Sequence, residues 1–160
     1  MTAPHNAASV ALAVMERIER PDNEAGEAQI NAMQIQKLVY YCQAYFLAIY
    51  GRPLFHEDVE AWVHGPVVRE LWKLHSGHIS ITAGELRANA ERNGMTISAL
   101  DDEEEVVVEA VCETLGGLTG WQLRNRTHEE APWIDNFVPG ERPHSRVIPH
   151  PEMQRYYRDL

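Results

Sequence analysis

The stretch NAMQIQKLVYYCQAYFLAIYG, residues 31–51, constrains the fold more than any other part of the chain. Its apolar side chains recur at intervals of three and four residues, the spacing that lines one face of an α-helix. These residues are Ile35, Leu38, Val39, Cys42, Tyr45, Phe46 and Ile49. Asn31 and Gln34 have the spacing of a capping box, and Gly51 can end the helix in the left-handed conformation. We therefore predict a central helix that is buried on most of its surface.

Other segments carry helical periodicity or helix-capping signals: residues 7–19, 66–75, 101–115, 119–131 and 150–160. Asp101 and Thr119 each have a glutamate or glutamine three residues on, as a capping box requires. Residues 53–64 favour an extended conformation, with a short strand-like segment before the turn at Gly65-Pro66. The predicted fold is a mostly α, compact single domain of about five or six helices.

The length of 160 residues fits one domain, and we take residues 1–160 as that domain. Residues 1–30 are expected to form an N-terminal helix and a loop. Residues 76–98 are polar and contain three glycines, so we expect a mobile insert with one short helix near residues 85–92.

The charge balance narrows the set of partners. The chain has 14 basic and 24 acidic residues and a net charge of −10, so it is repelled by phosphate backbones and anionic lipids. No run approaches the roughly 20 apolar residues of a membrane span, and the N-terminus lacks the basic start of a signal peptide. We expect no direct nucleic-acid partner, no membrane and a cytoplasmic location.

The segment VEAWVHGPVVRELW, residues 59–72, is the strongest candidate site. Gly65 permits a tight turn, and Pro66 is predicted to be the first residue of the following helix, where its missing N–H costs nothing. His64 could act as a general acid or base with Glu60 or Glu70. The alternative is a histidine that hydrogen-bonds the backbone at a turn, and it is favoured because the motif contains no nucleophile.

His128, between Thr127 and Glu129, poses the same two alternatives, and an anchor at a helix end is again favoured over a catalytic group. An enzyme would need Trp62, His64 and His128 to line one cleft. Trp62 and Trp133 lie outside the predicted helices, so at least one of them could be partly exposed at a protein interface.

No catalytic, metal or cofactor site is predicted. THEEAPW begins like a zinc-protease motif, but Pro132 stands where its second histidine should be. His75 and His78 flank a turn and lack further ligands nearby in the sequence. The chain has no phosphate-binding glycine loop and no nucleophile elbow.

Three motifs carry a resemblance to a known family: the helix motif KLVYY at residues 37–41, the turn WVHGPV at residues 62–67, and TH at residues 127–128 with PW at residues 132–133. From about Asn31 to its end, the chain resembles the Panacea domain, the SocA-like antitoxin family of bacteria and their phages. Many members have an aromatic residue where this chain has His64.

The resemblance implies a mostly α fold, no established catalysis and the antitoxin half of a toxin–antitoxin pair. Family members bind unrelated toxins directly, and delivery of the toxin to a cytoplasmic protease such as ClpXP is reported in the family. The hypothesis for this chain is a toxin-binding surface built from two segments. Its residues are Trp62, His64, Gly65, Pro66, Val67, Thr127, His128 and Trp133. The alternatives are a small enzyme that uses His64, His128 and nearby carboxylates, or a domain with another protein partner.

Overall fold

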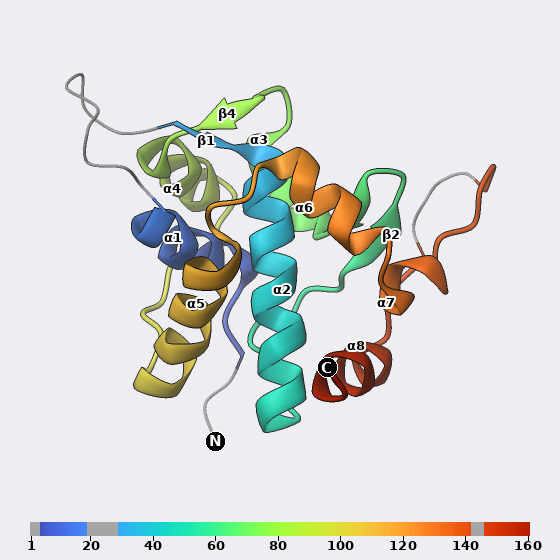
Figure 1. The fold of residues 1–160 in the computed structure, drawn as a ribbon. Helices are drawn as coiled ribbons and strands as arrows, with labels where there is room; N and C mark the ends of the chain where they lie inside the picture. The colour runs from blue at the N-terminus through green and yellow to red at the C-terminus, as the bar shows by residue number, and fades with distance from the viewer. Residues whose placement is uncertain (1–3, 19–28, 142–145) are drawn as a thin grey trace.

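A computed structural model describes residues 4–18, 29–141 and 146–160. These residues form eight α-helices and two small antiparallel sheets of two strands each. Figure 1 shows how these elements are arranged. The prediction of a mostly α domain is confirmed. The helix count exceeds the predicted five or six because short helices are present, such as the four-residue α7 (Ala131–Ile134). No helix of the described residues is long and apolar enough to cross a membrane.

Helix α2 (Ala32–Tyr50) is central, as predicted. It contacts α1 (Ala7–Ile18) and α5 (Asp102–Leu115) on one side and α8 (His150–Arg158) on the other (Figure 1). The side chain of Asn31 accepts the backbone N–H of Gln34 at 3.0 Å, and Gly51 ends the helix with φ +72°. The predicted capping box is only half formed, because the Gln34 amide instead donates to the carbonyls of Gly116 and Leu118. Ile49, expected on the buried face, is 61% exposed.

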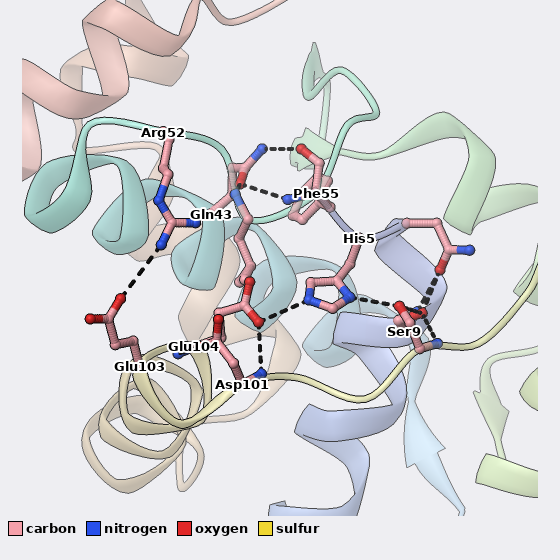
Figure 2. Close-up of polar contacts among 11 residues, drawn as sticks. His5, Ser9, Gln43, Arg52, Phe55, Asp101, Glu103 and Glu104 are labelled. Atoms are coloured by element: carbon pink, nitrogen blue, oxygen red, sulfur yellow. Dashed lines mark hydrogen bonds and ion pairs between the residues drawn. The ribbon is translucent and has the colours of Figure 1, made fainter. Parts of the chain in front are cut away.

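Buried polar groups join the segment around His5 to α5, and others join α2 to the loop that follows it. Figure 2 shows both sets in close-up. His5 contacts the Glu104 carboxylate through Nε2 at 2.9 Å and Ser98 Oγ through Nδ1 at 2.6 Å. Gln43 of α2 accepts the Leu54 N–H at 2.7 Å and donates to the Phe55 carbonyl at 2.9 Å. These hydrogen bonds pair buried polar groups of non-helical segments that have no partner within a helix or sheet.

The segment expected to be a mobile insert, residues 76–98, contains regular structure. Strand β4 (Ser80–Ile81) pairs with β1 (Ile30–Asn31), and helix α4 (Ala83–Arg92) begins two residues before the predicted short helix. A capping box between Thr82 and Glu85 starts α4, and its residues Leu86 and Ala90 are buried. The expected helix is therefore present, and the mobility of the segment stays a prediction.

A buried carboxylate joins α2 to α8 through tyrosines. Glu130, which follows α6 (Gly120–Thr127), accepts the hydroxyls of Tyr41 and Tyr157, both at 2.7 Å. Tyr40 lies 2.9 Å from the Tyr157 hydroxyl. Burial raises the pKa of Glu130. The network holds the segment after α6 in a fixed position against the central helix.

The Gly-Pro pair lies in a hairpin. Strands β2 (Glu60–Trp62) and β3 (Gly65–Val67) pair with Trp62 opposite Gly65, and helix α3 (Arg69–His75) begins only after them. The prediction that Pro66 is the first residue of the helix is therefore wrong. Gln36 explains the difference, because its side chain accepts the Val68 N–H and donates to the Val68 carbonyl, at 3.0 and 3.1 Å. These two hydrogen bonds hold the backbone of Val68 extended, so α3 begins at Arg69.

Candidate functional site

A pocket of about 420 Å³ lies between the hairpin, α2 and α3; we call it the hairpin pocket. It is lined by Met33, Gln36, Lys37, Trp62, Val63, His64, Val67, Arg69, Trp72 and His75. Its volume falls within the range of small-ligand and side-chain pockets, and most of its surface is apolar. These properties make it a candidate site for an apolar side chain or a small ligand.

Two tryptophans form the aromatic wall of the hairpin pocket. The rings of Trp62 and Trp72 meet edge to face with centroids 5.6 Å apart, and Trp72 is 39% exposed. Glu60 fixes Trp62 by accepting its indole N–H at 2.9 Å, and it also binds Arg69 at 2.8 Å. The Arg69 guanidinium in turn lies 5.4 Å from the centroid of the Trp62 ring. These contacts fix the orientation of the Trp62 ring in the wall.

Lys37 lies in the wall beneath the hairpin and is 1% exposed. Its Nζ donates to the Pro66 carbonyl at 2.9 Å. Burial, assisted by the positive charge of Arg124, lowers the pKa of Lys37 to about 7. A Cβ on Gly65, whose φ is +110°, would approach Lys37 Cε to 2.8 Å and Thr127 Oγ1 to 2.9 Å. Only glycine fits this turn without displacing the lysine.

His75 closes the pocket at the end of α3. Burial lowers its pKa to about 4, so the ring is neutral at physiological pH. Its Nε2 lies 3.0 Å from the Gln36 amide nitrogen, which also donates to the Val68 carbonyl. A neutral His75 accepts the second amide proton. In the sequence, His75 was considered only as a metal ligand and set aside. In the structure it is a buried hydrogen-bond acceptor for the Gln36 amide.

The second predicted segment supports the hairpin from behind. Trp133 donates its indole N–H to the Trp62 carbonyl at 2.7 Å, and its ring stacks on His128 at 3.8 Å and 7°. Thr127 Oγ1 donates to the Arg124 carbonyl at 2.7 Å. Burial first, and then the charge of Arg124, lower the pKa of His128 to about 4. None of Thr127, His128 and Trp133 lines the hairpin pocket.

The predicted site residues are therefore brought together, but in two roles. Trp62, His64 and Val67 line the pocket, while Gly65 and Pro66 form its turn. Trp62 and Trp133 are both partly exposed, as expected for at least one of them.

The enzyme alternative required one cleft that contains Trp62, His64 and His128. Trp62 and His64 share the pocket, but His128 stacks on Trp133 and does not line it, and the pocket lining includes no aspartate or glutamate. Within the part of the chain that the structure describes, no three His, Cys, Asp or Glu residues gather as a metal site. The arrangement suits binding by aromatic contact and hydrogen bonding.

Sequence reasoning missed Gln36 and Lys37, which connect the central helix to the hairpin. It also left Arg69 and Trp72 out of the eight residues of the binding hypothesis, although both lie in the candidate segment 59–72. One signal was available. Lys37 is one of only two lysines, and it lies among apolar residues of the central helix. A lysine is rarely buried without a specific partner. The partner, a carbonyl 29 residues away, was not visible in the pattern.

These features define a class: a small, mostly helical domain in which a β-hairpin and the central helix enclose a pocket. The family model "Antitoxin SocA-like, Panacea domain" matches residues 35–134, more than half of the 160 residues. The chain belongs to this family, and the resemblance drawn from its motifs is confirmed. Membership supports an antitoxin role, implies a toxin partner and points away from catalysis. Searches of curated proteins and of solved structures found no match to the chain.

Proposed function

We propose that this chain is an antitoxin that neutralises a cognate protein toxin by binding it directly at the hairpin pocket. The observation that carries the proposal is the partly exposed Trp62–Trp72 pair, which lies inside the segment matched by the family model. Tryptophans at the rim of an apolar pocket are typical of interface hot spots. The chain would act in the cytoplasm, without direct contact to nucleic acid.

The eight residues of the sequence hypothesis divide in this proposal. Trp62, His64 and Val67 contact the toxin. Gly65 and Pro66 set the shape of the turn, while Thr127, His128 and Trp133 position the hairpin. Substitution of the positioning residues weakens neutralisation by displacing the hairpin, so it also lowers stability.

The test is rescue of growth in cells that express the toxin, identified as the protein that co-purifies with the tagged chain and stops growth when expressed alone. Trp72→Ala removes one wall of the pocket and is expected to abolish rescue. Tyr50→Ala is the matched control, because Tyr50 is 38% exposed at the end of α2 and does not line the pocket. Both variants are first checked for a cooperative thermal transition. Full rescue by a folded Trp72→Ala variant would refute the assignment of this surface.

Delivery of the bound toxin to a ClpXP-type protease is the finer part of the proposal. A strain without the protease separates delivery from simple occlusion. If the chain delivers the toxin, the toxin accumulates and rescue fails in that strain. If rescue is equally good with and without the protease, occlusion alone is the mechanism.

A further inference from the structure

We infer that the hairpin pocket binds an acidic segment of the partner protein, with a large apolar side chain packed against the Trp62–Trp72 wall and a neighbouring carboxylate placed near Lys37 and Arg124. This inference rests on the proposed function and names the chemistry of the partner. It comes from the contrast between the charge of the whole chain and the charge around the pocket.

The chain as a whole carries a net charge of −10, yet the pocket lining includes two basic residues, Lys37 and Arg69, and no acidic residue. Glu60 neutralises Arg69 through two hydrogen bonds. Lys37 and Arg124 have no such partner, since neither makes an ion pair with any residue that the structure describes.

Arg124 is held at the rim of the pocket. Its guanidinium lies 4.6 Å from the centroid of the exposed Trp121 ring, and its Nε donates to His64 Nδ1 at 3.3 Å. His64 itself lines the pocket. The Arg124 guanidinium therefore places a positive charge directly beside a residue that lines the pocket. An arginine stacked on an aromatic ring is well oriented for a carboxylate.

Lys37 supplies the second observation. An ammonium group has three N–H donors, and among the described residues the Pro66 carbonyl accepts only one of them. A buried ammonium without a counter-ion is costly, and a partner carboxylate would remove that cost. The apolar part of the lining, which includes Met33, Val63 and Val67, favours a hydrophobic side chain beside that carboxylate.

The groups packed around Lys37 are positive or neutral. Arg124 and Thr127 face it from α6, His75 from α3, and His128 from the end of α6; β3 contributes only carbonyl and apolar groups. With its pKa lowered to about 7, Lys37 is mostly neutral at pH 8. A carboxylate beside it favours the charged form, so binding at pH 8 must take up a proton.

The first experiment selects peptides from a random twelve-residue phage-displayed library on the immobilised full-length chain. The expected result is enrichment of sequences in which aspartate or glutamate stands next to tryptophan, phenylalanine, leucine or methionine. Enrichment of basic or purely apolar sequences would overturn the inference. So would enriched peptides that bind the Trp72→Ala variant as tightly as the unmodified chain.

The affinity of the best peptide is then measured for two charge-reversal variants. Arg124→Glu is expected to weaken binding about tenfold or more, as the loss of a specific charge pair does. Arg155→Glu changes the net charge equally on exposed α8, and it is expected to change affinity less than threefold. Equal losses in both variants would mean that long-range charge alone steers the peptide, and would refute the specific site.

Calorimetric titration of the same peptide at pH 8, in two buffers of different ionisation enthalpy, counts the protons taken up. We expect more than about half a proton for the unmodified chain, and close to none for Lys37→Met. Equal uptake by the two proteins would exclude the lysine.

The toxin assay keeps this inference separate from the proposed function. If Arg124→Glu rescues growth fully while Trp72→Ala does not, the acidic-segment inference fails and the proposed function stands. If no co-purifying toxin is neutralised by the unmodified chain, the proposed function itself fails. Loss of rescue in both variants, with Arg155→Glu active, supports both.

Discussion

Replacing Lys37 by methionine tests the account of the pocket most directly. Methionine keeps an unbranched side chain of similar length but cannot be protonated, so the variant removes a titratable group from beneath the hairpin. In the free protein the pKa of Lys37 falls from the usual 10.5 to about 7, chiefly because the side chain is fully buried. The unfolded chain therefore binds more protons than the native one between these two pH values.

The sign and the magnitude follow from linkage. A group with a depressed native pKa opposes folding most strongly below pH 7, and this opposition declines as the pH rises toward 10.5. With these two values, the lysine disfavours folding by about 4–5 kcal/mol at pH 6 and by about 2 kcal/mol at pH 9. The unmodified protein should thus gain about 2–3 kcal/mol of unfolding free energy relative to Lys37→Met between pH 6 and pH 9.

The assay is urea unfolding of both proteins at pH 6, 7, 8 and 9, followed by tryptophan fluorescence and far-UV circular dichroism. The difference between the two proteins reports chiefly on Lys37, whose charge also contributes to the lowered pKa values of His75 and His128. The lost hydrogen bond to Pro66 adds a constant of about 1 kcal/mol that does not alter the slope. A difference independent of pH would refute the reasoning, since it would mean that Lys37 keeps its ordinary pKa in the fold.

Two further predictions concern the hairpin and the neutral histidines. Gly65→Ala places a Cβ at φ +110° and within 3 Å of Lys37 and Thr127, so it should lower the free energy of unfolding by about 2–4 kcal/mol in urea titration. Gly77→Ala is the control, because Gly77 also has a positive φ but its surroundings are open. This variant should lose only the backbone contribution, about 1–2 kcal/mol. Equal losses at the two positions would show that the contact beneath the hairpin is unimportant. Burial lowers the pKa values of His75 and His128 to about 4, so their ring proton resonances should keep the chemical shifts of neutral imidazole from pH 8 down to pH 5. The free energy of unfolding should fall as the pH falls from about 6.5 to 4, because the histidines of the unfolded chain are protonated first. A midpoint near 6.5 for either ring would contradict its burial.

The helices could be predicted because their signals are local. Asp101 and Thr119 form capping boxes with residues three positions away, and both boxes are present. The periodicity of residues 31–51 likewise identified the central helix. A helix is specified within a few turns by its own residues, so a single sequence contains most of the information about where it begins and ends.

The hairpin could not be predicted in the same way, because distant residues decide it. Pro66 followed by VVRELW is compatible with a helix start, and the local pattern favours one. The deciding contacts are those of Gln36 with Val68 and of Lys37 with the Pro66 carbonyl, each spanning about 30 residues. The half-formed box at Asn31 has the same origin, since Gln34 is drawn to the carbonyls after α5. Tertiary hydrogen bonds overrode a reasonable local preference in both cases.

The motif at residues 127–133 and the motif at residues 62–67 act as one unit, and this limits what a loss of function can mean. Trp133 reaches the Trp62 carbonyl, and Thr127 Oγ1 lies just beneath Gly65. A substitution at His128 or Trp133 is therefore expected to displace the hairpin even though neither side chain lines the pocket. Trp72, by contrast, is 39% exposed and contacts the hairpin through the Trp62 ring, so its removal is expected to disturb the turn less. Only a variant that retains its unfolding free energy and loses rescue would identify a residue that contacts the toxin, and we expect Trp72→Ala to meet that condition better than a variant of either motif.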